Sequence, residues 1–190
     1  MPTIRFILAA LALALSQFAG AGEPLHMNGE LHALYQADQA DRKGDAIDWQ
    51  LVGPRDLARQ LRVRELAEAG ALKHSGDYLH AAMVFQHGQT AEHYRQANLW
   101  ALRAVELDPT NTPARWLACA SEDRWLHRTG KPQIWGTQYQ KPSPDGSPAW
   151  SMEPFDRLAK TDAERVAMGV KTLAESAARL AEMNKKQSGK

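Results

Sequence analysis

Small residues recur at helical spacing in the middle of the chain, and they constrain the fold more than any other feature. Ala97, Ala101 and Ala104 lie three or four positions apart in the segment from residue 90 or 91 to 107. Residues with that spacing occupy one face of an α-helix. Pro109 follows the end of the segment. Because a face of alanines lets a neighbouring helix approach closely, the sequence predicts a tightly packed helical hairpin here.

The same alanines resemble the second helix of a tetratricopeptide repeat, which has small residues at these offsets and a proline shortly after them. The segment ELDPTN, residues 106–111, also looks like the turn between two such repeats. Tyr78, Ala82 and Phe85 have the spacing of the repeat's first helix but lie about three residues too far upstream. Since an array needs about three repeats, the resemblance implies a compact all-α bundle of antiparallel, tetratricopeptide-like hairpins instead.

Helical periodicity and stop signals divide the rest of the chain. Leu57, Leu61 and Leu66 predict an amphipathic helix whose apolar stripe faces the core. The segment TDAE, residues 161–164, is a capping box that predicts the start of a final helix. Together with the helix that ends at residue 107, the helices expected are 31–42, 54–69 (the amphipathic one), 77–86, 112 or 113–128, and 161–183 (the final one). Residues 131–155 contain five prolines and two glycines, which predicts a long proline-rich loop or a short hairpin before the last helix.

The N-terminus has the features of a secretory signal. A basic start is followed by the apolar run FILAALALAL and by Ala19-Gly20-Ala21, the small-residue pattern of a cleavage site. The apolar run is too short to span a bilayer, so we expect cleavage near Ala21 and a periplasmic or secreted protein; the alternative is an uncleaved anchor. The organisation expected is a signal peptide at 1–21, a flexible lead-in at 22–30, one helical domain at 31–183 and a disordered tail at 184–190.

Charge and cysteine content narrow the classes of partner. The formal net charge is +1, so there is no electrostatic footprint for nucleic acid, and we expect no membrane span after cleavage of the signal. Cys119 is the only cysteine, which excludes an intramolecular disulfide. Its apolar helical neighbours favour a buried, inert thiol over a nucleophile.

Polar residues are interspersed among apolar ones in several segments, which suggests a cleft or a structural polar network. Asp38 and Arg42 can pair one helical turn apart, and His87 stands where a helix ends before Gly88. Asp123 is placed to orient His127 four residues on. The candidate catalytic residues are His87, Asp123 and Asp41, and the candidate binding residues are Asp38, Arg42, Arg124, Gln133, Trp135 and Gln138. The alternative for each is a structural ion pair, a helix cap or a core contact.

A metal site is not expected, although histidines recur every six or seven residues from residue 74 to residue 93. Seven residues of helix rise about 10 Å, which is too far for two side chains to share one ion. The sequence also has no zinc-protease motif, no nucleophile elbow and no glycine-rich phosphate loop. We therefore predict neither a metal nor a cofactor.

The ordered set DQADR, QHG, DRWL and GKPQIWGTQ, followed by the late DAERVAMGVKTLAE, resembles a family of uncharacterised bacterial proteins described only as a domain of unknown function. The resemblance covers nearly the whole chain after the signal. Trp135 stands where the family is expected to have an aromatic residue, often Phe. The resemblance implies that one pattern joins Asp38, Asp41, Arg42, His87, Asp123, Arg124, Gln133 and Gln138. It implies no activity, cofactor or partner.

Two functions remain open on the sequence. The first is a binding module of the cell envelope that presents a groove to a peptide or an envelope protein. The absence of a catalytic motif favours it. The second is a small hydrolase-like enzyme in which His87 acts as general base, an aspartate orients it, and Arg42 or Arg124 holds an anion. The second requires that these residues converge in space. The sequence gives no oligomeric state.

Overall fold

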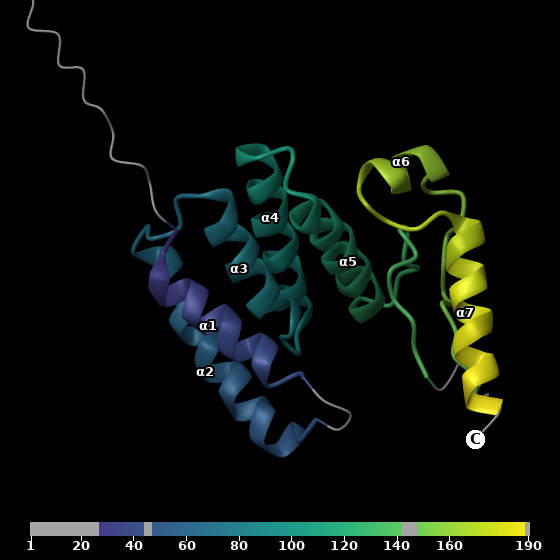
Figure 1. The fold of residues 1–190 in the computed structure, drawn as a ribbon, viewed down its shortest axis with the longest axis horizontal. Helices are drawn as coiled ribbons and strands as arrows, with labels where there is room; N and C mark the ends of the chain where they lie inside the picture. The colour runs from purple at the N-terminus through teal and green to yellow at the C-terminus, as the bar shows by residue number, and fades with distance from the viewer. Residues whose placement is uncertain (1–26, 44–46, 142–147, 189–190) are drawn as a thin grey trace, which may run out of the picture.

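The protein is all-α, as predicted, and its helices form a compact bundle (Figure 1). The computed structural model describes residues 27–43, 47–141 and 148–188. The predicted signal peptide and most of the predicted lead-in therefore lie outside the described residues. The helices are α1 (Gly29–Ala40), α2 (Trp49–Glu68), α3 (Ser75–Gln86), α4 (Ala91–Leu107), α5 (Thr112–Arg128), α6 (Asp162–Ala167) and α7 (Leu173–Ser188). Among the described residues, no helix has the length and apolar composition needed to cross a membrane.

Helices α3, α4 and α5 form the centre of the bundle, and small residues let them pack closely. Ala97, Ala101 and Ala104 of α4 are completely buried, and α4 packs against both α3 and α5. Ala82 and Leu117 complete this contact from α3 and α5. The predicted small-residue face is thus confirmed as the packing surface of a helical hairpin.

Helices α1 and α2 cover the other side of α3. Helix α2 begins at Trp49, where the Asp48 side chain accepts hydrogen bonds from the backbone N–H groups of residues 50 and 51, five residues before the predicted start. The predicted apolar stripe is wrong in part, because Leu57 and Leu61 are 57% and 52% exposed. The buried face of α2 is instead formed by Val52, Asp56, Arg59, Gln60, Val63 and Leu66. This face is rotated from the predicted one because its charged members are paired with α1.

The predicted final helix, 161–183, is interrupted. Gly169 adopts a φ of 73°, a conformation that ends helix α6 at low cost only for glycine. Helix α6 starts with the predicted capping box at Thr161. A second capping box precedes α7, where the Thr172 hydroxyl accepts from the Glu175 backbone N–H and the Glu175 carboxylate accepts from the Thr172 backbone N–H. Helix α7 continues to Ser188, so most of the tail predicted from residue 184 is helical.

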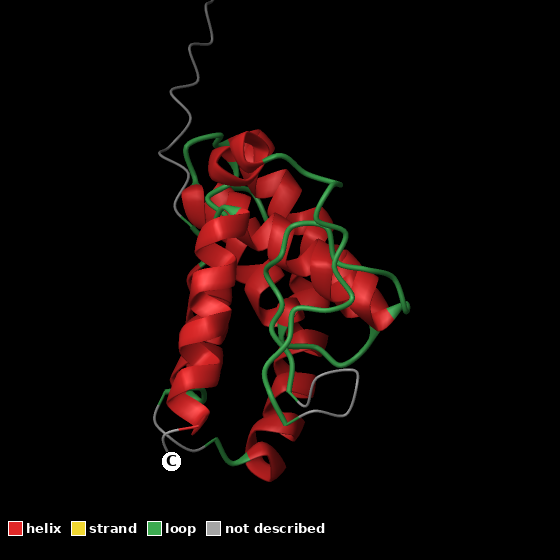
Figure 2. Cartoon of the chain, turned by 90° about the vertical axis from the view of Figure 1, so that its right-hand side faces the viewer, coloured by secondary structure: helices red, strands yellow, loops and turns green. Residues whose placement is uncertain are grey.

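The described parts of the segment from residue 131 to residue 155, which are 131–141 and 148–155, are loop and contain no strand (Figure 2). These parts are paired only by isolated bridges from Gln133 to Phe155 and from Gln140 to Ser151. Arg165 of α6 is completely buried and donates hydrogen bonds to the carbonyls of Ile134 and Trp135. The loop is therefore fixed between α5 and α6, on the same side as the end of α3.

Candidate functional site

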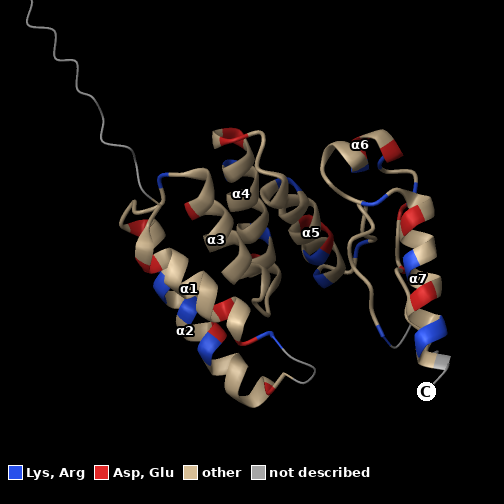
Figure 3. Cartoon of the chain, viewed as in Figure 1, with Lys and Arg blue, Asp and Glu red and all other residues tan. Residues whose placement is uncertain are grey.

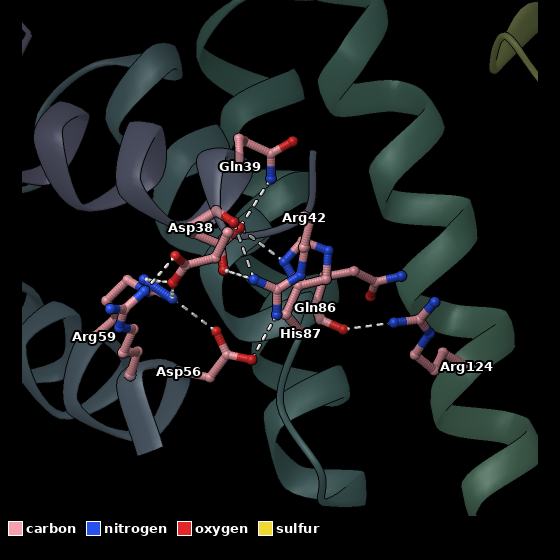
Figure 4. A network of polar contacts seen from close by, with 10 residues as sticks. Asp38, Gln39, Arg42, Asp56, Arg59, Gln86, His87 and Arg124 are labelled. Carbon is pink, nitrogen blue, oxygen red and sulfur yellow. Dashed lines mark hydrogen bonds and ion pairs between the residues drawn. The ribbon is translucent and has the colours of Figure 1, made fainter. Parts of the chain in front are cut away.

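A buried aspartate on α1 organises the first polar cluster (Figure 4). Asp38 is completely buried. One carboxylate oxygen accepts from Arg42 Nη1 at 2.9 Å, and the other accepts from Gln39 Nε2 at 2.8 Å and lies 2.8 Å from His87 Nδ1. Asp38 and His87 are 49 positions apart in the sequence. The predicted pair of Asp38 and Arg42 is confirmed, and Asp38, rather than Asp41 or Asp123, orients the imidazole of His87.

The cluster continues into α2 as an alternating row of arginines and aspartates. Arg42 Nη2 lies 2.5 Å from Asp56 Oδ2, and Arg59 Nη2 lies 3.1 Å from Asp56 and 2.5 Å from Asp41. Asp41 also accepts from Arg55 at 2.8 Å. Figure 3 shows these charges gathered where α1 and α2 lie together. Asp41, a candidate catalytic residue, therefore fixes α2 to α1 instead of contacting His87.

The end of α3 presents His87 to a cavity. His87 directly follows the last residue of α3 and is the C-cap of that helix. The His87 side chain is 20% exposed. Gly88 is needed next because a Cβ there would lie 2.4 Å from the side chain of His93, too close for a contact between carbon atoms. The short QHG motif therefore orients the imidazole and leaves room for the first turn of α4.

A second polar cluster lies beyond α5 and serves the loop. Asp123 is completely buried. One of its oxygens accepts from the backbone N–H groups of Ile134 and Trp135, and the other accepts from the backbone N–H and hydroxyl of Thr137. All four distances are between 2.7 and 2.9 Å. The predicted contact with His127 is wrong, since the oxygens of Asp123 are occupied by the loop and His127 Nε2 lies 3.4 Å from the Pro154 carbonyl.

Gln133 and Trp135 belong to the same loop structure. Gln133 is completely buried. Its amide donates to the carbonyls of Gln138 and Met152 and accepts from the Gln138 backbone N–H. Trp135 is buried as well, and its indole N–H donates to Glu122 at 2.8 Å. Both candidate binding residues therefore have their polar groups satisfied within the protein and are not free to hold a ligand.

Arg124 connects the two clusters. Its Nη1 donates to the Gln86 carbonyl at 2.7 Å, and its Nε donates to Gln138 Oε1 at 3.2 Å. Gln138 Nε2 donates to the Ala120 carbonyl, which turns the amide oxygen of Gln138 towards Arg124. Burial lowers the pKa of Arg124, and the positive charge of Arg42 lowers it further. Among the described residues, Arg124 has no carboxylate partner.

These side chains surround a cavity of about 320 Å³. Its lining includes Arg42 after α1, Asp56 of α2, His87 after α3 and Arg124 of α5, together with Trp49 and Gly53 at the start of α2. The volume is at the small end of the range for small-ligand pockets, roughly 300–1,000 Å³. Of the nine candidate residues, Arg42, His87 and Arg124 line the cavity, and Asp38 lies directly behind His87.

Two further cavities extend the first one along α2. The second, of about 480 Å³, shares Gly53 and Asp56 with the first and reaches Leu57 and His93. The third, also about 480 Å³, shares His93 with the second and reaches Phe85 and Trp100. The three cavities share lining residues in turn and so form a row between α2 and α4, which we call the α2/α4 groove, with Phe85 of α3 lining one end.

The sequence analysis missed the contribution of α2 to this site. Asp56, Arg59 and Val63 recur at spacings of three and four residues, and Leu57 and Leu61 are four residues apart. The spacing therefore allows either of two overlapping faces of α2 to be buried. Hydrophobicity favours the apolar face. The charged face is the buried one because Asp41 and Arg42, directly after α1, supply its partners, and local spacing does not reveal that pairing.

Two other groups bear on the chemistry of the site. Cys119 is buried, as predicted, and burial raises the pKa of its thiol, which disfavours the nucleophilic thiolate. Within the described residues, no group of three or more His, Cys, Asp or Glu side chains is placed to hold a metal ion. Comparison of the chain with models of protein families, with curated proteins and with solved structures found no match.

Proposed function

We propose that the protein is a peptide- or protein-binding module of the cell envelope and that the α2/α4 groove is its binding surface. The observation that carries the proposal is the row of three cavities with shared lining residues along α2, a helix with exposed apolar side chains. Trp49, Leu57 and Leu61 of α2 are each more than half exposed. Exposed apolar side chains beside a groove are typical of protein interaction sites.

The two ends of the groove differ in charge, which favours one direction for a bound peptide. Two arginines and one aspartate line the first cavity, and of the two arginines only Arg124 has no carboxylate partner among the described residues, so this end offers an unbalanced positive charge. Two glutamates, Glu68 and Glu92, and one arginine, Arg64, line the third cavity, so the other end is negative. The apolar middle, at Pro54 and Leu57, separates them. An extended peptide with an acidic group at one end and a basic group at the other complements this distribution.

Binding can be tested with dye-labelled peptides of random sequence applied to the immobilised protein. Leu57→Asp should lower the retained fraction about tenfold, because it places a charge in the apolar middle of the groove and removes the burial of a leucine side chain. Leu158→Asp is the matched control, since Leu158 is 95% exposed and outside the groove. Equal retention by the wild type and Leu57→Asp would place the binding surface elsewhere.

The cell-envelope location rests on the signal-like N-terminus, residues 1–21. Fractionation of the native host should find the processed chain outside the cytoplasm. Mass spectrometry of that chain should give a new N-terminus near Gly22. Recovery of the unprocessed chain in the cytosol would contradict the location and leave the groove proposal in place.

A second candidate function, a hydrolase-like enzyme, is favoured by one observation. Asp38 contacts His87 Nδ1, the arrangement in which a carboxylate orients an imidazole that acts as a base. None of the described residues that line the cavity is Ser, Thr or Cys, so His87 would activate water rather than one of these side chains. A panel of dye-releasing esters and amides tests this function. Turnover that is lost in His87→Gln and kept in His127→Gln would support an enzyme.

A further inference from the structure

The two arginines of the first cavity differ in how their charge is balanced. Arg42 contacts two carboxylates, Asp38 at 2.9 Å and Asp56 at 2.5 Å. Arg124 contacts only neutral acceptors, the Gln86 carbonyl and the Gln138 side-chain oxygen. Its Nη2 makes no hydrogen bond with any described residue. Arg124 is therefore the group in this cavity whose charge and donors remain available to a ligand.

The protein holds Arg124 in a fixed orientation. Its Nη1 and Nε are bonded to groups on opposite sides, the end of α3 and the loop after α5. Its guanidinium also lies 5.7 Å from the centre of the Tyr94 ring. A guanidinium that is already oriented loses little side-chain entropy when it binds an anion. The pairing of Gln138 with Arg124 thus orients a donor towards the cavity.

We propose that Arg124 anchors the C-terminal carboxylate of a peptide bound in the α2/α4 groove, a proposal that rests on the function proposed above. A carboxylate supplies the single negative charge that Arg124 lacks. The cavity is the end member of the row of three, and Arg42, which follows α1, and Arg124 of α5 line it. We therefore place the last residue of a peptide that runs along α2 in this cavity.

The direction of the peptide follows from this anchor. Its C-terminal residue occupies the cavity beside His87, and the preceding residues run past Leu57 towards Trp100. Glu68 and Glu92 then face a position several residues before the C-terminus. The ligand class is accordingly a peptide with a free C-terminus, apolar residues before it and a basic residue further upstream.

Three dye-labelled random peptide libraries test the proposal on the purified full chain. The first has a free C-terminal carboxylate, the second a C-terminal carboxamide, and the third a carboxamide after a glutamate fixed at the last position. Retention of the first library should exceed that of the second by about tenfold, the effect of one charge-assisted hydrogen bond. Arg124→Gln should reduce it to the level of the second. Arg128→Gln, an exposed arginine one turn further along α5, should leave it unchanged.

Each other outcome overturns a different statement. Equal retention of the first two libraries, at a level that Leu57→Asp reduces, would overturn the carboxylate anchor and keep the peptide-binding function. Equal retention of the first and third libraries would overturn the selectivity for a C-terminus, because a glutamate side chain would then serve equally well. Absence of retention for all three libraries would overturn the peptide-binding function itself. The comparison of libraries on the wild-type protein decides the anchor even where Arg124→Gln does not fold.

Discussion

Asp38 and Asp123 are both completely buried, yet the two regions around them use a carboxylate differently. Asp123 accepts three backbone N–H groups and one hydroxyl from the loop at 134–137. Asp38 accepts only from side chains, those of Gln39, Arg42 and His87. The first arrangement builds a loop, whereas the second positions side chains at a cavity. The partners of a buried aspartate, rather than its burial, therefore indicate whether a site lies nearby.

The two regions also differ in how far the hydrogen-bond partners of the aspartate can adapt to a substitution. A backbone N–H can only donate, so the loop around Asp123 has no alternative pairing. A glutamine amide can turn over and a neutral imidazole can change its tautomer, so the partners of Asp38 can reverse their donors and acceptors. Arg42 in addition keeps Asp56 when Asp38 changes. We therefore expect the region around Asp38 to tolerate substitution better than the region around Asp123.

The matched pair Asp123→Asn and Asp38→Asn tests this directly. Asp123→Asn should lower the free energy of unfolding by about 3–5 kcal/mol, because an amide N–H group faces donors that cannot reverse. Asp38→Asn should lower it by about 1.5–3 kcal/mol, the range for a hydrogen bond to a charged group. Urea unfolding measures both. Equal losses of stability would show that donor adaptability does not matter here.

Much of the fold could be predicted from local pattern. The start and end of α4 and α5, the alanine face and the pairing of Asp38 with Arg42 all depend on residues within one or two helical turns. The candidate site could be predicted only as a set of residues. Its convergence depends on contacts such as Asp38 to His87, 49 positions apart. Asp123 was assigned to His127 because their spacing is local, while its true partners lie 11 to 14 positions further on.

A second pair of substitutions compares the regions through their glycines. Gly136, in the loop held by Asp123, has a φ of 78°, and a Cβ there would lie 2.7 Å from Phe155. Gly88, beside His87, has no positive φ, but a Cβ there would lie 2.4 Å from His93. Gly136→Ala should cost about 2–4 kcal/mol, since backbone strain adds to the steric clash.

Gly88→Ala should cost about 1–3 kcal/mol from the steric clash alone. It should also weaken peptide retention, because His93 lines the second and third cavities of the groove. Thermal unfolding compares the stabilities, with Gly29→Ala as control for an open position on α1. A loss for Gly88→Ala that matches the loss for Gly136→Ala would mean that positive φ contributes little at residue 136.

Low pH should destabilise the region of the α2/α4 groove through protonation of His93. Burial lowers the pKa of His93, and the charge of Arg64 lowers it further, while its Nδ1 is buried without a hydrogen-bond partner. A histidine with a lowered folded-state pKa binds a proton more weakly folded than unfolded, so its protonation destabilises the fold. Stability should therefore fall as the pH decreases below the ordinary histidine value of about 6.5.

His93→Gln should reduce this loss in urea titrations between about pH 7 and pH 5, whereas His127→Gln, on the loop side, should not. A dependence that is unchanged in His93→Gln would assign the acid sensitivity to another group, such as His80, whose pKa burial also lowers.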